Sequence, residues 1–247
     1  MKNQYVLVTG GSRGIGRSVC LALASRGFVV LFTYLSNESK AQELVAEMNA
    51  GGGTAYAYRC DMSDLKEVIR LASTIRKEHG RLDAIVNNAG ILGDGKPFLM
   101  AQDDHWWDVI RTNVGSVTNT CRALLPLMIA QKGGRIINIT SLSGQKGNPG
   151  QSAYSASKSA IVTFSRSLAK EVGRFGVTIN CISPGLIETD MTKDISDTYV
   201  SNRMAWSPLK RKGQADEVAN LVAYMICDAP GYIVGQELTI DGGIGIS

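Results

Sequence analysis

The segment Tyr5–Gly16 reads YVLVTGGSRGIG, and this stretch decides the fold. Its opening residues are strong β-formers and predict a short strand at 5–8. A glycine-rich turn follows and leads directly into residues 15–25, where apolar side chains recur with helical spacing. A turn in this place presents free backbone N–H groups at the positive end of the helix dipole, which favours binding of a phosphate group. The spacing is GxxxGxG, so a tight turn without a ligand remains the alternative for this motif alone.

The rest of the chain alternates short apolar runs with longer amphipathic stretches. Further strands are predicted at 28–32, 55–58, 84–86, 135–139, 177–182 and 237–240. Further helices are predicted at 38–48, 65–78, 106–129, 153–172 and 216–227. About seven strands separated by helices indicate a mostly parallel sheet with helices on both faces. We therefore expect an α/β, doubly wound Rossmann fold that forms a single domain over residues 1–247.

The composition excludes several other classes of protein. Apolar residues make up 44% and charged residues 19%, which is ordinary for a soluble globular chain. The net charge of +4 includes no long basic tract, so it gives no support to nucleic-acid binding. No apolar run approaches the ~20 residues of a membrane helix. The five cysteines form no CxxC pair, and the two histidines match no metal-site spacing. These features predict a cytoplasmic protein with free thiols, no metal and no membrane association.

Further short motifs follow the glycine turn in a definite order. They are Thr9, Gly10, Gly14 and Gly16 in the turn, Asp61, Asn87-Asn88-Ala89-Gly90, Asn113, Ser141, Tyr154, Lys158, Pro184-Gly185 and Thr189. In order and spacing the chain resembles the short-chain dehydrogenase/reductase family from Val6 to its C-terminus. The resemblance implies that Asn113, Ser141, Tyr154 and Lys158 are catalytic. It implies that the cofactor contacts Gly10, Ser12, Arg13, Gly14, Ile15, Gly16, Tyr34, Asp61, Met62, Asn88, Ala89, Gly90, Tyr154, Lys158, Pro184, Gly185, Ile187 and Thr189.

The chemistry of the predicted catalytic residues agrees with this resemblance. Tyr154 and Lys158 are four positions apart on a predicted helix, so they share one face. A neighbouring ammonium would lower the pKa of the phenol, which then exchanges protons near neutral pH. Ser141 follows a strand in a loop and could hold the substrate oxygen. By resemblance, Asn113 positions a water that links Lys158 to solvent, and Lys158 binds the nicotinamide ribose.

Each of these assignments has a structural alternative. A Tyr and a Lys at this spacing are commonly a pair on the helix surface. Ser143 competes with Ser141 for the role of the catalytic serine. Asn113 could mark a helix kink, and Asp61 could cap the turn that follows it.

Charge near the second predicted strand indicates which cofactor binds. Proteins that use NADH commonly place an acidic residue at the end of this strand, where the present chain has Tyr34 followed by Leu35, Ser36 and Asn37. No carboxylate there repels a 2′-phosphate, and Arg13 could bind one with its guanidinium. The sequence therefore favours NADPH, and with it reduction of a ketone. The alternative is that Arg13 is an ordinary exposed loop residue.

The substrate is indicated by resemblance within the family. Residues 184–191, PGLIETDM, and the ending at 235–243 are most similar to 3-oxoacyl-[acyl-carrier-protein] reductases. Acyl carrier protein is acidic, and Lys132 matches one family docking position; the other, normally Arg, is Phe175 here, with Arg174 beside it. The alternatives are a reductase of a free small ketone, such as a sugar, steroid or quinone, and a non-catalytic nucleotide sensor. Sensors on this fold lose the Tyr or the Lys, whereas this chain keeps both.

Two expectations concern the surroundings of the site. Residues 188–212 show no clear period, and a long irregular segment of this kind is commonly functional, so we expect a substrate lid, with a packed surface excursion as the alternative. Family members are usually homotetramers or homodimers. By that resemblance, helices 106–129 and 153–172 would form the larger interface.

Overall fold

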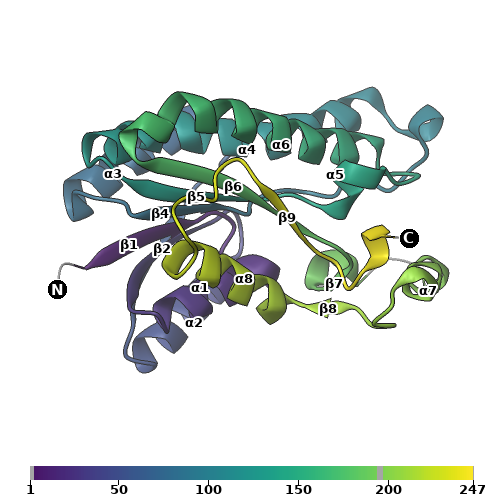
Figure 1. Cartoon of the computed structure of the whole chain (residues 1–247), viewed down its shortest axis with the longest axis horizontal. Helices are drawn as coiled ribbons and strands as arrows, with labels where there is room; N and C mark the ends of the chain where they lie inside the picture. The colour runs from purple at the N-terminus through teal and green to yellow at the C-terminus, as the bar shows by residue number, and fades with distance from the viewer. Residues whose placement is uncertain (1–2, 194–196, 247) are drawn as a thin grey trace.

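A seven-stranded parallel sheet forms the centre of the molecule (Figure 1). The computed structural model describes residues 3–193 and 197–246. The strands are β1 (Gln4–Val8), β2 (Phe28–Tyr34), β3 (Thr54–Arg59), β4 (Ala84–Asn87), β5 (Gly134–Ile139), β6 (Val177–Pro184) and β9 (Glu237–Ile240). Their order is β3-β2-β1-β4-β5-β6-β9, and every neighbouring pair is parallel. The predicted doubly wound α/β fold is confirmed.

The strand order reverses between β1 and β4, and this reversal places the site. From β1 the chain builds outward through β2 and β3, and then returns to add β4 on the other side of β1. The loops after β1 and β4 therefore leave the sheet in opposite directions and open a crevice at its carboxyl edge. Ligands of open α/β sheets bind at such a point.

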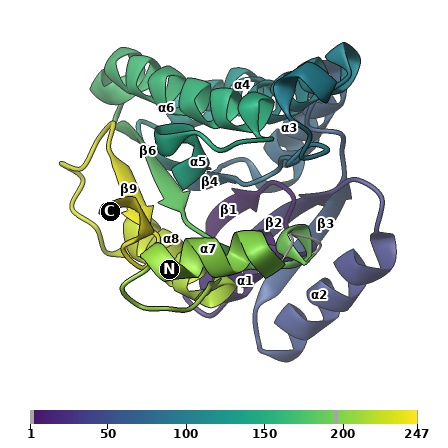
Figure 2. The same ribbon diagram turned by 90° about the vertical axis from the view of Figure 1, so that its right-hand side faces the viewer.

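Helices cover both faces of the sheet in three layers (Figures 1 and 2). One face carries α1 (Gly14–Ala24), α2 (Glu38–Ala50) and α8 (Ala215–Cys227), and the other carries α3 (Leu65–His79), α4 (Asp103–Ala130) and α6 (Ser152–Val172). Each face of the sheet packs against its helices in a separate apolar core, because the strand side chains alternate between the two faces. All residues of β2 are buried, as expected for a strand covered on both sides.

Local residue chemistry sets the ends of the helices near the crevice. The Asn37 side chain accepts a hydrogen bond from the backbone N–H of Lys40 and caps α2. Asp64 caps α3 in the same way by accepting from Lys66, and Gly80 ends that helix with a φ of 71°. No helix among the described residues has the length and apolar character needed to cross a membrane.

The segment after β6 contains more regular structure than its sequence suggests. It forms β7 (Ile187–Glu188), the 3-10 turn η3 (Asp190–Thr192), α7 (Asp197–Trp206) and β8 (Gly213–Gln214), which pairs in parallel with β7. The expectation of an irregular segment at 188–212 is therefore wrong for the described part. Residues 194–196 of the predicted lid lie outside the described residues. Helix α7 lies beside the 3-10 turn η4 (Ile244–Ile246) near the C-terminus rather than over the sheet, so it lacks a strong apolar stripe (Figure 2).

The remaining short elements border the loops. They are η1 (Phe98–Met100), α5 (Leu142–Lys146) and η2 (Gly173–Phe175). The sequence predicts a loop at 141–144, whereas the structure places a short helix there, capped by Ser141. Five residues are too few to show a helical period, which explains the difference.

Candidate active site

The glycine turn after β1 is held in place by the end of β4. The Thr9 hydroxyl accepts hydrogen bonds from the backbone N–H groups of Asn88 and Ala89, each at 3.0 Å. The Asn88 side-chain amide in turn donates to the carbonyls of Thr9 and Gly10, at 3.0 Å each. A Cβ on Gly16 would overlap the Gly10 carbonyl and lie 2.6 Å from that same amide nitrogen. Only glycine at position 16 lets the turn lie this close to the strand end.

A cleft at the carboxyl edge of the sheet runs along this turn. Most of the predicted cofactor residues line it, namely Gly10, Ser12, Arg13, Gly14, Ile15, Tyr34, Asp61, Met62, Asn88, Ala89, Gly90 and Thr189. Gly16, Pro184 and Ile187 do not line it. They are buried beneath the turn and in the strands behind the cleft, where they shape its wall. Gly185 lines a neighbouring pocket.

The cleft also has lining residues that the sequence did not point out. These are Thr33, Leu35, Ser36, Asn37, Lys40, Cys60, Ser63, Ile91, Thr112, Ser116, Asp190 and Met191. The sequence does indicate Leu35, Ser36 and Asn37 as lining residues, because they closely follow a predicted strand that ends at the crevice. Asp190 and Met191 also sit in the PGLIETDM stretch. Lys40 and Thr112 lie inside helices and give no sequence signal of their own.

The cleft fits the extended anionic shape of a dinucleotide cofactor. The bare backbone of Gly10 and Gly14 opens the path over the turn, and both residues have φ values that favour glycine, 64° and 53°. Arg13 is exposed on the lining and has no ion-pair partner in the described part of the chain. Asp61 also caps the turn that follows it, as the alternative interpretation expected. Its carboxylate accepts hydrogen bonds from the Ser63 N–H at 2.9 Å and from the Ser63 hydroxyl at 2.7 Å.

Ser141 and Tyr154 meet in the second pocket, which adjoins the cleft at Met191. Their side chains are hydrogen-bonded to each other. Ser141 precedes α5 and its Oγ also accepts from the Ser143 N–H at 3.1 Å. The competing residue, Ser143, donates to Gln151 at 3.1 Å and accepts from Asn148 at 2.6 Å. Because Ser143 is engaged by these neighbours, the geometry favours Ser141 as the serine that meets the substrate.

Lys158 and Asn113 lie behind this pair, inside the protein. Lys158 is 4% exposed, so with Tyr154 it does not form the surface pair that the spacing alone allows. Its ammonium donates to the Ile139 carbonyl at 2.9 Å and lies 5.6 Å from the centre of the Tyr154 ring. A Cβ on Gly90 would lie 2.9 Å from Asn113 Oδ1 and 3.6 Å from Lys158 Nζ. A side chain at position 90 would therefore crowd both Asn113 and Lys158.

The side chain of Asn113 makes three hydrogen bonds. Its Oδ1 accepts from the Ile91 N–H at 2.8 Å, and its Nδ2 donates to the Ile91 carbonyl and to the Ser157 hydroxyl, each at 3.0 Å. The amide group therefore fastens the loop after β4 to α4 and α6.

Burial dominates the electrostatics of the pair. It raises the pKa of the Tyr154 phenol above its ordinary value, and the hydrogen bond with Ser141 offsets only part of this shift. Burial also lowers the pKa of Lys158 from 10.5 to about 8, opposed by the nearby Cys181 thiol. The expected lowering of the Tyr154 pKa is wrong for this geometry, because desolvation is the largest influence on the phenol and raises its pKa. Tyr154 therefore holds its proton at neutral pH.

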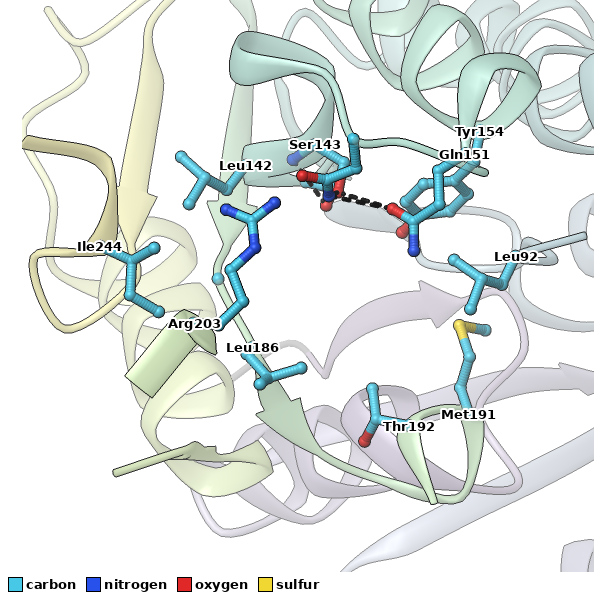
Figure 3. A pocket seen from close by; sticks show the side chains of 13 residues that line it. Leu92, Leu142, Ser143, Gln151, Tyr154, Leu186, Met191, Thr192, Arg203 and Ile244 are labelled. Carbon is cyan, nitrogen blue, oxygen red and sulfur yellow. Dashed lines mark hydrogen bonds between the residues drawn. The ribbon is translucent and has the colours of Figure 1, made fainter. Parts of the chain in front are cut away.

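The second pocket has one polar and one largely apolar wall (Figure 3). Ser143, Gln151 and Tyr154 lie on one side, and Leu186, Met191 and Thr192 lie opposite them, with Leu92 at the end nearest Tyr154. The opposite wall comes from the segment that follows β6, and Arg203 of α7 also reaches the pocket. A ligand between the walls would place one end against Ser141 and Tyr154. Among the described residues, no three His, Cys, Asp or Glu side chains are grouped to hold a metal ion.

The chain belongs to the short chain dehydrogenase family of oxidoreductases, because residues 4–200 match the model of that family. Its family implies a nicotinamide cofactor, which the cleft along the glycine turn fits. The chain is 42% identical to a 3-oxoacyl-[acyl-carrier-protein] reductase of Synechocystis over 242 residues, covering 98% of this chain and 96% of that protein. It is 40% identical to the reductase of the same name from Escherichia coli over 243 residues, covering 98% of each. A third such reductase, from Staphylococcus epidermidis, is 38% identical and covers 98% of this chain and 99% of its own length.

Proposed function

We propose that the chain reduces a 3-oxoacyl thioester, carried on acyl carrier protein, to the 3-hydroxyacyl thioester with NADPH. The observation that carries the proposal is that Ser141 and Tyr154 line one pocket beside the cofactor cleft, with the Lys158 ammonium 5.6 Å from the Tyr154 ring. The names of the relatives supply the class of substrate. The reaction belongs to fatty-acid or polyketide-type biosynthesis.

The residues divide the work as follows. Ser141 and Tyr154 hydrogen-bond to the ketone oxygen and hold the carbonyl carbon toward the cleft. The reduced nicotinamide, when bound, supplies a hydride to that carbon. As negative charge grows on the oxygen, the O–H bond of Tyr154 breaks and its proton forms the new alcohol. Lys158 stabilises the remaining phenolate with its positive charge, and solvent returns the proton.

Contacts with the cofactor would come from the residues of the cleft. The turn from Gly10 to Ile15 would hold the diphosphate, Asp61 and Met62 the adenine, and Lys158 the nicotinamide ribose. No carboxylate stands at Tyr34 or in the three residues after it, and exposed Arg13 lines the same cleft. This arrangement supports NADPH over NADH, since a 2′-phosphate would meet a cation and no anion.

The carrier protein is the less direct part of the proposal. Lys132 and Arg174 are both exposed, and the Arg174 guanidinium lies 4.7 Å over the Phe175 ring. The turn at Gly176, which follows η2, lies against the turn at Lys132, because a Cβ on Gly176 would be 2.7 Å from the Lys132 carbonyl. Lys132 and Arg174 therefore lie on adjacent turns where β5 and β6 begin. They offer a basic surface for an acidic carrier. The second candidate substrate is a free ketone, which the polar wall of Ser143, Asn148 and Gln151 could also bind.

The surroundings of the site complete the proposal. Residues 188–212 act as a lid over the second pocket, which Met191, Thr192 and Arg203 line. The protein works in the cytoplasm as a homotetramer or homodimer built on α4 and α6, as is usual in the family.

A substrate panel tests the proposal. Purified wild-type chain and Tyr154→Phe are assayed for NADPH and NADH oxidation with an acetoacetyl thioester and with free sugar, steroid and quinone ketones. Wild type should turn over the thioester best and prefer NADPH, and Tyr154→Phe should lose about 10³-fold in kcat. Ser143→Ala should keep most activity whereas Ser141→Ala loses it. Full turnover by Tyr154→Phe, or a free ketone used better than the thioester, would contradict the proposal.

A further inference from the structure

One ion pair crosses the cofactor cleft and involves none of the residues that the family resemblance assigns to the cofactor. The Lys40 ammonium lies 3.6 Å from Asp190 Oδ2. Lys40 comes from the first turn of α2 and Asp190 from η3, and both side chains line the cleft. The pair therefore joins the two walls between which the cofactor would lie. The side chains are 50% and 35% exposed, so the attraction between them is weak.

Lys40 follows the strand end near which the adenine ribose of a cofactor is expected. It belongs to the capped N-terminus of α2, directly after the strand end that distinguishes NADH from NADPH users. Arg13 lines the same cleft, so the cleft offers two cations to an anionic group. Ser36 and Asn37 add polar groups, and the N-terminal end of the helix itself favours an anion. The one carboxylate in this helix turn, Glu38, is exposed and does not line the cleft.

Asp190 is fixed on the opposite wall by its own turn. The Thr192 hydroxyl donates to the Ile187 carbonyl at 2.7 Å and accepts from the Thr189 N–H at 3.0 Å, which anchors η3 to β7. Thr189 in turn packs against the glycine loop, since a Cβ on Gly14 would lie 3.6 Å from it. If the Lys40 side chain moves, Asp190 cannot move with it without breaking these contacts.

Asp190 also has a second cation that stays with it. Lys193 Nζ lies 2.6 Å from Asp190 Oδ1, one turn further along. Lys193 first and then Lys40 hold the pKa of this carboxyl below its usual range, so it is ionised at neutral pH. If Lys40 turns away, Lys193 still compensates the carboxylate. Exchange of partners therefore leaves no uncompensated charge on Asp190.

We propose that Lys40 is a second ligand of the cofactor 2′-phosphate. Its ammonium pairs with Asp190 before the cofactor binds and pairs with the phosphate afterwards. The inference rests on the proposed function, because it presupposes a cofactor with that phosphate. The exchange is favourable because a phosphate monoester carries a charge of about −1.5 to −2, against −1 for a carboxylate. Asp190 thus weakens binding slightly while it keeps Lys40 directed across the cleft.

Calorimetric titration with two cofactor fragments tests the inference without any turnover. The ligands are adenosine 2′,5′-bisphosphate and 5′-AMP, which differ only in the 2′-phosphate. Lys40→Gln should weaken binding of the bisphosphate about fivefold to tenfold and change 5′-AMP binding by less than about twofold. Lys40→Arg should retain most of the bisphosphate affinity. Lys77→Gln, which removes a lysine near the far end of α3, is the matched control for net charge and should leave both affinities unchanged.

Asp190 supplies the second arm of the test. Asp190→Asn should strengthen bisphosphate binding about twofold to threefold in wild type, and this gain should vanish in the Lys40→Gln background. An unchanged ratio of the two ligand affinities in Lys40→Gln would overturn the inference. If Arg13→Ala still weakened the bisphosphate in that case, the proposed NADPH preference would stand. If the wild-type chain bound both fragments equally, the NADPH preference itself would fail first.

Discussion

Replacing Lys158 by Met should make the folded chain more stable at neutral pH while it abolishes activity. The pKa of Lys158 is lowered from 10.5 to about 8 because the ammonium is buried. At about 1.36 kcal/mol per pKa unit, holding this group charged inside the protein costs about 3 kcal/mol. The substitution also removes the hydrogen bond to the Ile139 carbonyl, a loss of about 1 kcal/mol. The net expected gain in the free energy of unfolding at pH 7 is about 2 kcal/mol.

The pH dependence gives this prediction a distinctive signature. The folded pKa lies below the unfolded one, so the unfolded chain binds more protons between pH 8 and 10.5. The wild-type free energy of unfolding should therefore rise with pH across that window, and the advantage of Lys158→Met should shrink toward zero. Urea titrations at half-unit steps from pH 6.5 to 9.5 measure the difference. Lys170→Met, at an exposed position on the same helix, is the control and should show no such trend. A pH-independent loss of stability in Lys158→Met would refute the reasoning.

Two further predictions concern activity and packing. Because Lys158 stabilises the phenolate only as a cation, kcat/KM for ketone reduction should fall as pH rises through about 8; a profile that stays flat to pH 10 would contradict this assignment. Gly16→Ala should destabilise the chain by about 1–3 kcal/mol, since its methyl group would overlap the Gly10 carbonyl. In α4, Gly115→Ala meets nothing within 4 Å and should be neutral or stabilising, so equal melting temperatures for the two variants would argue against the packing of the glycine turn.

The sheet and the glycine turn are predictable from sequence because their signals are local. A strand covered on both faces is a continuous apolar run, which 28–32 shows plainly, and alternation with amphipathic stretches implies parallel pairing. The turn after β1 lies close to the end of β4 and needs glycine for this approach. A short glycine motif in the sequence therefore reveals the turn. Thus the cleft and most of its predicted lining could be anticipated.

Features that depend on tertiary packing could not be anticipated. Helix α7 packs beside the C-terminal turn, and its apolar pattern is too weak to separate it from a loop. Lys40 and Asp190 are far apart in the sequence, so only the fold brings their charges together. The pKa of Tyr154 was expected to fall because its neighbour is a cation, but its direction depends on burial, which spacing on a helix does not reveal. Sequence reasoning thus identified which groups lie near each other better than the balance of forces among them.

The length of α6 has a consequence for carrier docking. Its 21 residues span about 30 Å, with Tyr154 in the first turn and Arg174 just beyond the last. A carrier seated on Lys132 and Arg174 would therefore sit about 30 Å along α6 from the reaction centre of the same chain. In an assembly that packs α6 helices head to tail, that basic surface would instead lie near the neighbouring subunit's pocket. If the proposed carrier docking and assembly both hold, an isolated subunit should therefore reduce carrier-bound substrates less well than small thioesters.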